Sequence, residues 1–405
     1  MSVPLRQIVD VALYMMKQRL TGNKRYPLVL MLEPLFRCNL ACPGCGKIDY
    51  PPEILNQRLS VEDCLAAAEE CGAPIVSIPG GEPLIHREMP QIVRGLIAQK
   101  RHVYLCTNAL LLDKKMSDYE PSPYFTFQIH LDGLREDHDR AVNKQGVYEI
   151  AERAIKNALS RGFNVNINTT LFQNAVPERT ANFLDYMMEL GISSVTISPG
   201  YAYERAADQD HFLNRTNTKN LFRELFKLGK ERVKQGKPKW RFSQSSLFLD
   251  FLAGNQTYEC TPWGTPCYSI FGWQRPCYLV GEGYAETYKE LMEDTQWDKY
   301  GTGRYAKCND CMVHCGYEPS AAEDAIRHPL KSLIVALRGP RTEGPMAPEL
   351  DMSNVRPAEY VFSDHVEKTL EDIKSGRARF LSNLDHPREE EEEPHKCCCG
   401  GCCCR

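Results

Sequence analysis

FRCNLACPGCGKIDY, residues 36–50, is the stretch that decides how this chain is interpreted, because it places three cysteines on one short loop. Cys38, Cys42 and Cys45 form a Cys-x3-Cys-x2-Cys run directly after an apolar, strand-like segment, residues 28–34. Three thiolates on a tight loop can hold three irons of a cubane cluster and leave the fourth iron open. An open metal position is typical of a site that performs chemistry. The alternative is a structural zinc, which would need a fourth nearby cysteine or histidine, and none follows at short range.

Strand-like and helix-like segments alternate between residues 28 and 204. The strand-like segments are apolar and contain β-branched residues, and amphipathic stretches separate most of them. They are residues 28–34, 74–80, 102–108, 124–133, 164–172 and 193–200. A helix after the first of them begins at a capping box, Ser60 with Asp63, and stops at Gly72. Six such repeats predict parallel strands with right-handed crossovers, in an open or closed barrel or a doubly wound sheet.

Unusual residues follow the carboxyl ends of these strands, where α/β folds place their active sites. After the second strand, the paired glycines of Gly80-Gly81-Glu82-Pro83 would let a ligand approach the backbone closely. The fourth strand ends in His130-Leu131-Asp132-Gly133, where Asp132 either contacts a ligand or caps the turn. Further candidates at these ends are Asn108, Asn168, Thr169 and the pair Pro199-Gly200.

The cysteine loop after the first strand, with GGEP after the second, resembles the radical S-adenosylmethionine (SAM) superfamily. The resemblance implies an α/β fold, a partial (β/α)6 barrel of the radical SAM type with a cysteine-containing C-terminal extension. It also implies a [4Fe–4S] cluster on the loop cysteines, whose open iron takes SAM and whose electron yields the 5′-deoxyadenosyl radical. The implied ligands are Cys38, Cys42 and Cys45 for the metal, and Gly80, Gly81, Glu82, Asn108, His130, Asp132, Asn168 and Pro199 for SAM. In one departure, Gly44 stands where the superfamily usually has an aromatic residue.

Cys106 lies at the end of the third strand, in LCTN. A buried cysteine is usually a small hydrophobic residue. A thiol S–H is also a good hydrogen-atom donor, and an enzyme that adds an adenosyl radical to a double bond leaves a carbon radical that needs a hydrogen atom. We therefore expect Cys106 to be the catalytic donor if its side chain faces inward.

Six of the 18 cysteines lie between Cys260 and Cys315, and six more lie in the last nine residues. Cys308, Cys311 and Cys315 have metal-ligand spacing, with His314 adjacent. The pattern faintly resembles C-terminal extensions of radical SAM enzymes that hold auxiliary clusters, but it departs from them in number and spacing. An auxiliary cluster, a structural zinc and reduced thiols remain alternatives. The candidate second metal site comprises Cys260, Cys267, Cys277, Cys308, Cys311 and Cys315.

Residues 1 to about 385 resemble the adenosylhopane synthase family of bacterial hopanoid biosynthesis, through blocks such as LCTNALLL, FQIHLDG, SSLFLDFLAG and KCNDCMVHCGYEP. This resemblance implies a hydrophobic hopene substrate, to whose terminal alkene the adenosyl radical adds, with SAM consumed as co-substrate. A reductant such as flavodoxin or ferredoxin is implied as a partner. The alternatives are another radical SAM enzyme, acting on a peptide or cofactor with an auxiliary cluster, and an iron–sulfur electron carrier or scaffold.

The composition is that of an ordinary soluble protein, with a net charge of −4 and 25% charged residues. The absence of a basic stripe gives no case for a nucleic-acid partner. Without a signal peptide or a long apolar run, the chain is expected in the cytoplasm, with peripheral contact at the inner face of the membrane left open.

The predicted organisation has five parts: an N-terminal helix (1–25), a radical SAM core (26–210), a cysteine-containing extension (211–338), a helical tail (339–385) and a disordered acidic, cysteine-rich tail (386–405). Later helices are expected at 218–235, 245–254, 323–338 and 363–384. The first helix is amphipathic, and we expect its apolar face to pack on the core, although its basic residues also suit a membrane surface. That face comprises Ile8, Val9, Ala12, Leu13, Met16 and Leu20.

Overall fold

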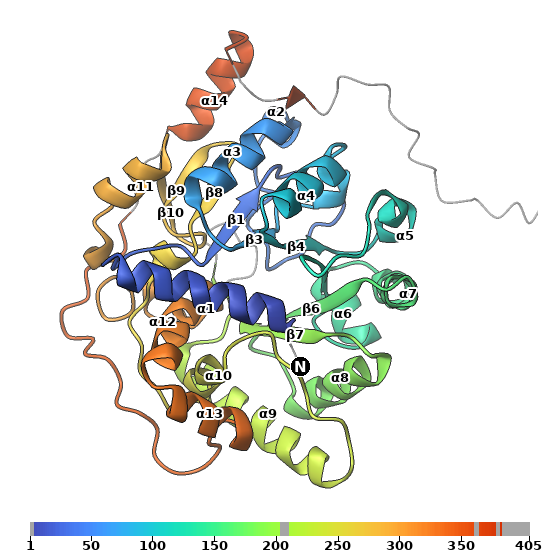
Figure 1. Cartoon of the computed structure of the whole chain (residues 1–405), viewed down its shortest axis with the longest axis vertical. Helices are drawn as coiled ribbons and strands as arrows, with labels where there is room; N and C mark the ends of the chain where they lie inside the picture. Colours follow the sequence, from blue (N-terminus) through green and yellow to red (C-terminus); the bar gives the residue numbers. More distant parts are fainter. Residues whose placement is uncertain (1–3, 203–209, 360–363, 378–380, 383–405) are drawn as a thin grey trace, which may run out of the picture.

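A computed structural model describes residues 4–202, 210–359, 364–377 and 381–382, so the predicted tail at 386–405 lies outside the described residues. Within these ranges one nine-stranded sheet forms the centre of the molecule, in the order β10-β9-β8-β1-β3-β4-β5-β6-β7 (Figure 1). Its edge strands, β10 and β7, do not pair with each other, so the sheet is an open, partial barrel. The predicted α/β fold class is confirmed.

The parallel core of the sheet coincides with the six predicted segments. Its strands are β1 (Val29–Glu33), β3 (Ile75–Ile78), β4 (His102–Thr107), β5 (Phe125–His130), β6 (Asn164–Leu171) and β7 (Ser194–Pro199). In β7, Val195 and Ile197 belong to the main hydrophobic core, whereas Thr196 alternates with them and lines a cavity inside the barrel. Strand β7 therefore buries its apolar side chains under the helices and turns Thr196 into the barrel.

Helices cover the outer face of these strands. They are α3 (Val61–Cys71), α4 (Met89–Ala98), α5 (Leu112–Lys115), α6 (Arg135–Ala141), α7 (Val147–Ser160) and α8 (Pro177–Leu190). The predicted limits of α3 are confirmed: the Ser60 hydroxyl accepts a hydrogen bond from the Asp63 amide at 3.0 Å, and Gly72 ends the helix at φ +72°.

Three strands of the sheet come from the C-terminal half and were not predicted. They are β8 (Cys267–Ser269), β9 (Gly272–Pro276) and β10 (Gly281–Ala285), and β8 pairs in parallel with β1. The segments are short and contain glycine and proline, so they lack the periodic apolar pattern by which the other strands were found. A separate two-stranded sheet joins β2 (Gln57–Arg58) to β11 (Leu381–Ser382).

The remaining helices lie mostly after β7. They are α2 (Pro52–Leu55), α9 (Arg215–Lys234), α10 (Ser246–Leu252), α11 (Tyr288–Asp294), α12 (His314–Arg327), α13 (Pro329–Arg338) and α14 (His365–Lys374). The single helix predicted at 323–338 is wrong: the structure has two helices that meet at His328, because Pro329 cannot continue the first one. Short 3-10 turns are η1 (Pro83–Ile85), η2 (Met116–Asp118), η3 (Pro262–Gly264), η4 (Trp297–Lys299) and η5 (Ala306–Cys308).

Helix α1 (Leu5–Leu20) crosses the barrel near α12 (Figure 1). Its orientation differs from the prediction, because much of the apolar face expected on the core is exposed: Val9 by 46%, Leu13 by 59% and Leu20 by 86%. Polar residues turn inward instead, since the Tyr104 hydroxyl donates to Gln7 at 2.9 Å, and His102 and Asp10 lie 2.9 Å apart. No helix in the described ranges has the length and apolar character needed to cross a bilayer.

Candidate active site

The three loop cysteines follow β1 and lie close together. The Cys45 amide donates to the Cys42 carbonyl at 3.0 Å, and the Leu40 amide donates to the Cys38 sulfur at 3.4 Å. Burial raises the pKa of Cys42 to about 12, and the neighbouring thiols of Cys45 and Cys38 add to the effect. Three thiolates so close together would repel one another unless a cationic group held them, so this donor set fits an iron–sulfur cluster.

A single metal ion fits less well. In the described part of the chain, no three His, Cys, Asp or Glu side chains converge as the ligands of one ion. Structural zinc sites are almost always closed by four such ligands. The same finding applies to an iron–sulfur cluster at either cysteine group, whereas the three cysteines of the loop are one fewer than a structural zinc site needs.

The glycines of GGEP bring the loop after β3 against the cysteine loop. A Cβ on Gly81 would lie 2.2 Å from the Arg37 carbonyl oxygen, and one on Gly80 would lie 2.8 Å from that of Leu35. Amides of the motif donate to the same segment, Gly81 to Leu35 at 3.0 Å and Glu82 to Arg37 at 2.8 Å. In this structure the glycines are therefore needed so that the chain's own backbone, from β1 into the cysteine loop, can approach.

Glu82 ties the GGEP loop to the end of β4. Its buried carboxylate accepts hydrogen bonds from the Thr107 hydroxyl at 2.8 Å and the Asn108 amide at 2.8 Å. Burial raises the pKa of Glu82 to about 7, against the lowering effect of these bonds. The Asn108 side chain reaches the cysteine loop, donating to Asn39 at 2.7 Å and lying 3.9 Å from the Cys38 sulfur. Glu82 and Asn108 thus lie beside the loop, where the sequence predicted them.

His130 and Asp132 form a buried pair at the end of β5. Their side chains lie 2.8 Å apart, and Asp132 also accepts the Thr170 amide at 2.8 Å. Burial alone would raise the pKa of Asp132, but His130 and the hydrogen bonds outweigh it and hold that pKa below its usual value. The Asp132 carboxylate therefore stays charged and fixes the end of β5 against β6, close to Cys42.

Phe172 is the residue that sequence reasoning missed. It directly follows β6, and its ring lies 3.3 Å from the position that a Cβ on Gly44 would take and 2.6 Å from that of Gly200. Its ring stacks on His211 with centroids 4.1 Å apart. The sequence held one indication of this role for Phe172: Gly44 stands where the superfamily usually has an aromatic residue. The missing ring leaves a space that a ring from another segment can fill. A cavity of about 320 Å³ opens here, lined in part by Pro43, Asp132 and Phe172.

Two further predicted SAM contacts lie on β6 and β7. Asn168 is in register with His130 and Thr196, in the middle of the sheet. Pro199 is in register with Leu171, whose side chain belongs to the hydrophobic core. The structure thus brings Asn168 toward the candidate site, whereas Pro199 contributes backbone at its edge.

Cys106 points into the barrel, on the same face of β4 as Tyr104. Its sulfur lies 3.5 Å from the Ser77 hydroxyl, and both Ser77 and Tyr104 line a cavity of about 530 Å³. The next residue on this face is Asn108, which reaches the cysteine loop. Cys106 therefore stands between the cysteine loop and the cavity, and burial raises its pKa to about 11, which keeps the thiol protonated at neutral pH.

Apolar atoms make up most of the cavity surface, although half of the residues that line it are polar. α1 contributes Ile8, Val11 and Met15, α12 contributes Ala325 and Ile326, and β1 contributes Val29 and Met31. His314 also lines it; burial lowers the pKa of His314 to about 4, and its ring nitrogen bonds the Ser198 hydroxyl at 2.6 Å. The volume is in the range of small-molecule sites, roughly 300–1,000 Å³.

Glu318 places a carboxyl group in this cavity. One oxygen accepts the Ser245 amide at 2.8 Å, and the other has no hydrogen-bond partner among the described residues. Burial raises the pKa of Glu318 to about 7. The neutral acid is therefore the favoured form below neutral pH, as an apolar cavity requires.

Replacing Glu318 with glutamine is expected to stabilise the protein increasingly as the pH rises. Because the folded-state pKa of about 7 exceeds the ordinary 4.5, the stability that the wild-type group contributes is complete below about pH 4.5 and is lost as the pH rises through 7. This loss is up to about 3 kcal/mol, reduced by the partial solvent access of the side chain. Thermal unfolding at about pH 5 and about pH 8 measures it. Glu224→Gln, on the exposed face of α9, is the control; a Glu318→Gln difference that stays constant with pH would contradict the prediction.

The second cysteine group converges only in part. Cys277 lies close enough to Cys260, Cys308, Cys311 and Cys315 to raise the pKa of each, after the larger effect of burial. Cys277 also raises the pKa of Cys267, but the Cys267 thiol lies 3.3 Å from the Glu33 carboxylate, which has the larger effect after burial. Cys308 ends η5, and Cys315 lies in the first turn of α12.

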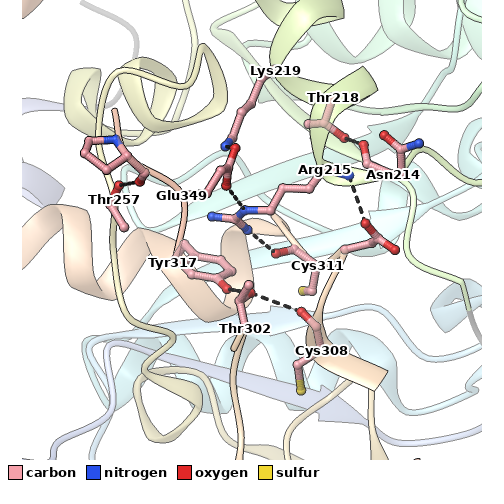
Figure 2. Close-up of polar contacts among 12 residues, drawn as sticks. Asn214, Arg215, Thr218, Lys219, Thr257, Thr302, Cys308, Cys311, Tyr317 and Glu349 are labelled. Carbon is pink, nitrogen blue, oxygen red and sulfur yellow. Dashed lines mark hydrogen bonds and ion pairs between the residues drawn. The ribbon is translucent and has the colours of Figure 1, made fainter. Parts of the chain in front are cut away.

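Hydrogen bonds hold the backbone carbonyls of Cys308 and Cys311 (Figure 2). The Arg215 guanidinium donates to the Cys311 carbonyl at 3.1 Å, and the Thr302 hydroxyl donates to the Cys308 carbonyl at 3.1 Å. Thr302 also bonds the Tyr317 hydroxyl at 2.5 Å. Both sulfur atoms take no part in the network that Figure 2 draws.

Comparison with known proteins agrees with this geometry. Residues 32–187 match the family model described as "Radical SAM superfamily", and residues 195–335 match one described as "Domain of unknown function (DUF3463)". Among curated proteins, GTP 3′,8-cyclase of Clostridium perfringens is 27% identical over 144 residues, 34% of this chain and 45% of that protein. Fe-coproporphyrin III synthase of Methanosarcina barkeri is 26% identical over 151 residues, 36% of this chain and 38% of that protein. The chain thus matches less than half the length of each.

Solved structures share the fold. SuiB of Streptococcus suis superposes with a TM-score of 0.56 at 16% identity, over 75% of this chain and 76% of that chain. AnSMEcpe with bound AdoMet superposes with a TM-score of 0.50 at 17% identity, over 77% and 96%. Together with the cysteine loop, these findings place residues 32–187 in the radical SAM superfamily and imply a [4Fe–4S] cluster with SAM. None of these relatives is named for hopanoid chemistry.

Proposed function

We propose that this protein is an adenosyl-adding radical SAM enzyme whose substrate is hopene, a polycyclic lipid with a terminal alkene. The observation that carries the proposal is the largely apolar cavity inside the barrel, whose lining residue Ser77 lies 3.5 Å from the Cys106 sulfur. A rigid hydrocarbon needs such a dry, apolar space, because water or a stray donor would intercept a carbon radical. The resemblance of several sequence blocks to the adenosylhopane synthases supports the same substrate.

The chain's residues divide into three roles. Cys38, Cys42 and Cys45 would hold the [4Fe–4S] cluster, which when bound supplies the electron that cleaves SAM to methionine and the 5′-deoxyadenosyl radical. Around SAM, the GGEP backbone and Glu82 would hold its methionine end, while Asn108, His130, Asp132 and Asn168 would contact or order its remaining groups. Phe172 would give the adenine a ring to stack on, in place of the aromatic residue missing at Gly44.

Cys106 would complete the reaction. Bond formation between the adenosyl C5′ and the terminal alkene carbon leaves an unpaired electron on the tertiary carbon. Transfer of the Cys106 S–H hydrogen atom to that carbon forms the new C–H bond and leaves a thiyl radical. One electron from a flavodoxin- or ferredoxin-class reductant, with one proton, restores the thiol.

An anaerobic assay of reconstituted protein with SAM, a reductant and hopene tests the proposal. We expect a product with the combined mass of hopene and the adenosyl group, and methionine in equal amount. 5′-Deoxyadenosine without adduct would keep the radical chemistry and reject hopene as the substrate. Intact SAM in the presence of a reduced cluster would reject the radical chemistry itself.

A second candidate is a radical SAM enzyme that modifies a peptide or cofactor with the help of an auxiliary cluster. The comparisons favour it, because the curated relatives are named for GTP and coproporphyrin chemistry and SuiB has a structure with a bound precursor peptide. This candidate predicts a second cluster and no requirement for Cys106, so the two proposals differ in measurable ways.

We also propose that the second cysteine group binds an iron–sulfur cluster through four of Cys260, Cys277, Cys308, Cys311 and Cys315. Their convergence on Cys277 from three separate segments supports this, as does the firm backbone around Cys308 and Cys311. Iron that stays bound after the loop cysteines are removed is the test. A chain that then binds no iron would reject the second cluster.

A further inference from the structure

The exposed apolar side chains of this protein are concentrated on two helices. In the described part of the chain, nine of the twelve exposed large hydrophobic residues lie on α1 or α13. On α1 the exposed residues follow helical spacing along one stripe, and so do those on α13. They are Ile8, Val9, Leu13, Met16 and Leu20, and Leu330, Leu333, Ile334 and Leu337. Exposed apolar patches of this kind mark interaction sites.

The apolar composition of helix α13 is not explained by packing within the described part of the chain. Its sequence, PLKSLIVALR, is strongly apolar, yet none of its residues is buried. Leu330 is exposed by 75% and Leu337 by 72%. A helix of this kind hides its apolar stripe only against something outside the described chain.

Helix α1 is held rigidly in the orientation that exposes its stripe. Its inner face is fixed by the contacts of Gln7 and Asp10 with β4, and Arg19 binds the Glu323 carboxylate on α12 at 2.8 Å. Among the α1 side chains that the structure describes, Met15 is the only large apolar one that is fully buried. These contacts fix the orientation of α1, so its apolar stripe is held at the surface of the folded protein.

The two stripes border the apolar cavity. Ile8 lines the cavity and is itself 49% exposed, so the cavity reaches the surface beside α1. On the other side it is lined by Ala325 and Ile326 of α12 and by Ser332 of α13, next to the exposed Leu333. The cavity thus extends from the surface stripes to Ser77, whose hydroxyl lies 3.5 Å from the Cys106 sulfur.

The charges around the stripes suit an anionic surface. Lys17 and Arg338 are exposed in the last turns of α1 and α13. The side chains of Arg6 and Arg327 are exposed by 56% and 65%, and each is paired with an acidic side chain, Asp10 and Glu323 respectively. Long basic side chains beside an apolar stripe are typical of helices that lie in a membrane interface.

We propose that the exposed stripes of α1 and α13 form one docking surface for a lipid bilayer, through which a lipid substrate enters the cavity without crossing water. The proposal deepens the proposed function, on which its substrate rests. A second copy of this chain is the rival occupant, but the basic rims would face each other in such a pair and repel.

Flotation of the reconstituted protein with vesicles of mixed zwitterionic and anionic phospholipid tests the surface itself. We expect wild-type protein to float with the vesicles, and a Leu13→Asp, Leu333→Asp double variant to lose at least about tenfold in partitioning, since each buried leucine contributes that order. The matched control is Val176→Asp, Val233→Asp, which changes two valines of similar exposure, 49% and 44%, away from both helices. Equal flotation of both variants, or none by the wild type, would overturn the proposal. So would a wild-type dimer in analytical ultracentrifugation that the Leu13→Asp, Leu333→Asp variant dissociates.

Adduct formation separates this proposal from the proposed function. With hopene embedded in vesicles the double variant should be slower than wild type, whereas with detergent-dispersed hopene the two should match. Vesicle binding without any adduct would reject hopene and leave the docking surface standing. Adduct from vesicle-embedded hopene at equal rates in both proteins would reject the surface and leave the proposed reaction standing.

Discussion

Replacing Cys38, Cys42 and Cys45 together with alanine is expected to abolish SAM cleavage and to remove four irons per chain. The three thiols are the cysteines of the loop at residues 36–50, and a cluster bound there would lose all of its protein ligands. The loss of SAM-cleaving activity should exceed the roughly 10- to 100-fold loss that follows mutation of residues that only support metal ligands. Iron and sulfide analysis, together with the release of methionine from SAM, measures both effects.

Cys64→Ala is the matched control, because Cys64 is a fully buried thiol on α3, away from the loop. It should retain both iron and SAM cleavage. Iron that persists in the triple variant, with the spectrum of a cluster, is the outcome expected if the second cysteine group is occupied. SAM cleavage by the triple variant would show that the loop does not hold the reactive cluster.

Replacing Cys106 with alanine or serine is expected to abolish the saturated adduct while SAM cleavage continues. The raised pKa of Cys106, about 11, keeps its S–H bond intact at neutral pH, and the sulfur lies between the cavity and the cysteine loop. Serine preserves a hydroxyl near Ser77 but holds its hydrogen too strongly to give it to a carbon radical. Without the donor, the mass of the saturated adduct should disappear from the mass spectrum, while methionine is still released from SAM.

A protein variant at the neighbouring position distinguishes chemistry from packing. Ser77→Ala removes the contact partner of Cys106 but keeps the thiol, so adduct formation should persist. In deuterated water, the exchangeable Cys106 thiol should place deuterium in the wild-type adduct. Full adduct from Cys106→Ala would show that the hydrogen atom comes from elsewhere.

The parallel core was predictable because its signals are local. Each of its strands is a short apolar run between turn residues, and caps such as Ser60 and Gly72 act within a few residues of the helix ends. The site followed from the same logic, since parallel strands bring their carboxyl ends together. Glu82 and Asn108 accordingly meet beside the cysteine loop although 26 positions separate them.

What sequence reasoning missed depends on contacts between distant segments. Strand β8 is extended because it pairs with β1. The three residues Cys267–Ser269 carry no local sequence signal that predicts this pairing. The apolar stripe of α1 was predicted to pack on the core. Helical periodicity shows that a helix has an apolar face, but it does not show whether that face points to the core or to the surface. Phe172 could be found only through the space beside Gly44, which a sequence does not show.

The pairing of β1 with β8 also sets an order of events during synthesis. The first partner of β1, β3, is about fifty residues further along the chain. The other edge of β1 remains unpaired until β8 has been synthesised, roughly 230 residues after β1. At about 5–20 residues per second, this delay on the ribosome is roughly 12–50 s. An open strand edge invites pairing with other chains. For much of translation, the cysteine loop therefore follows a strand that is paired on one side only. Chaperones and the iron–sulfur assembly machinery would bind the nascent chain in that incompletely paired state.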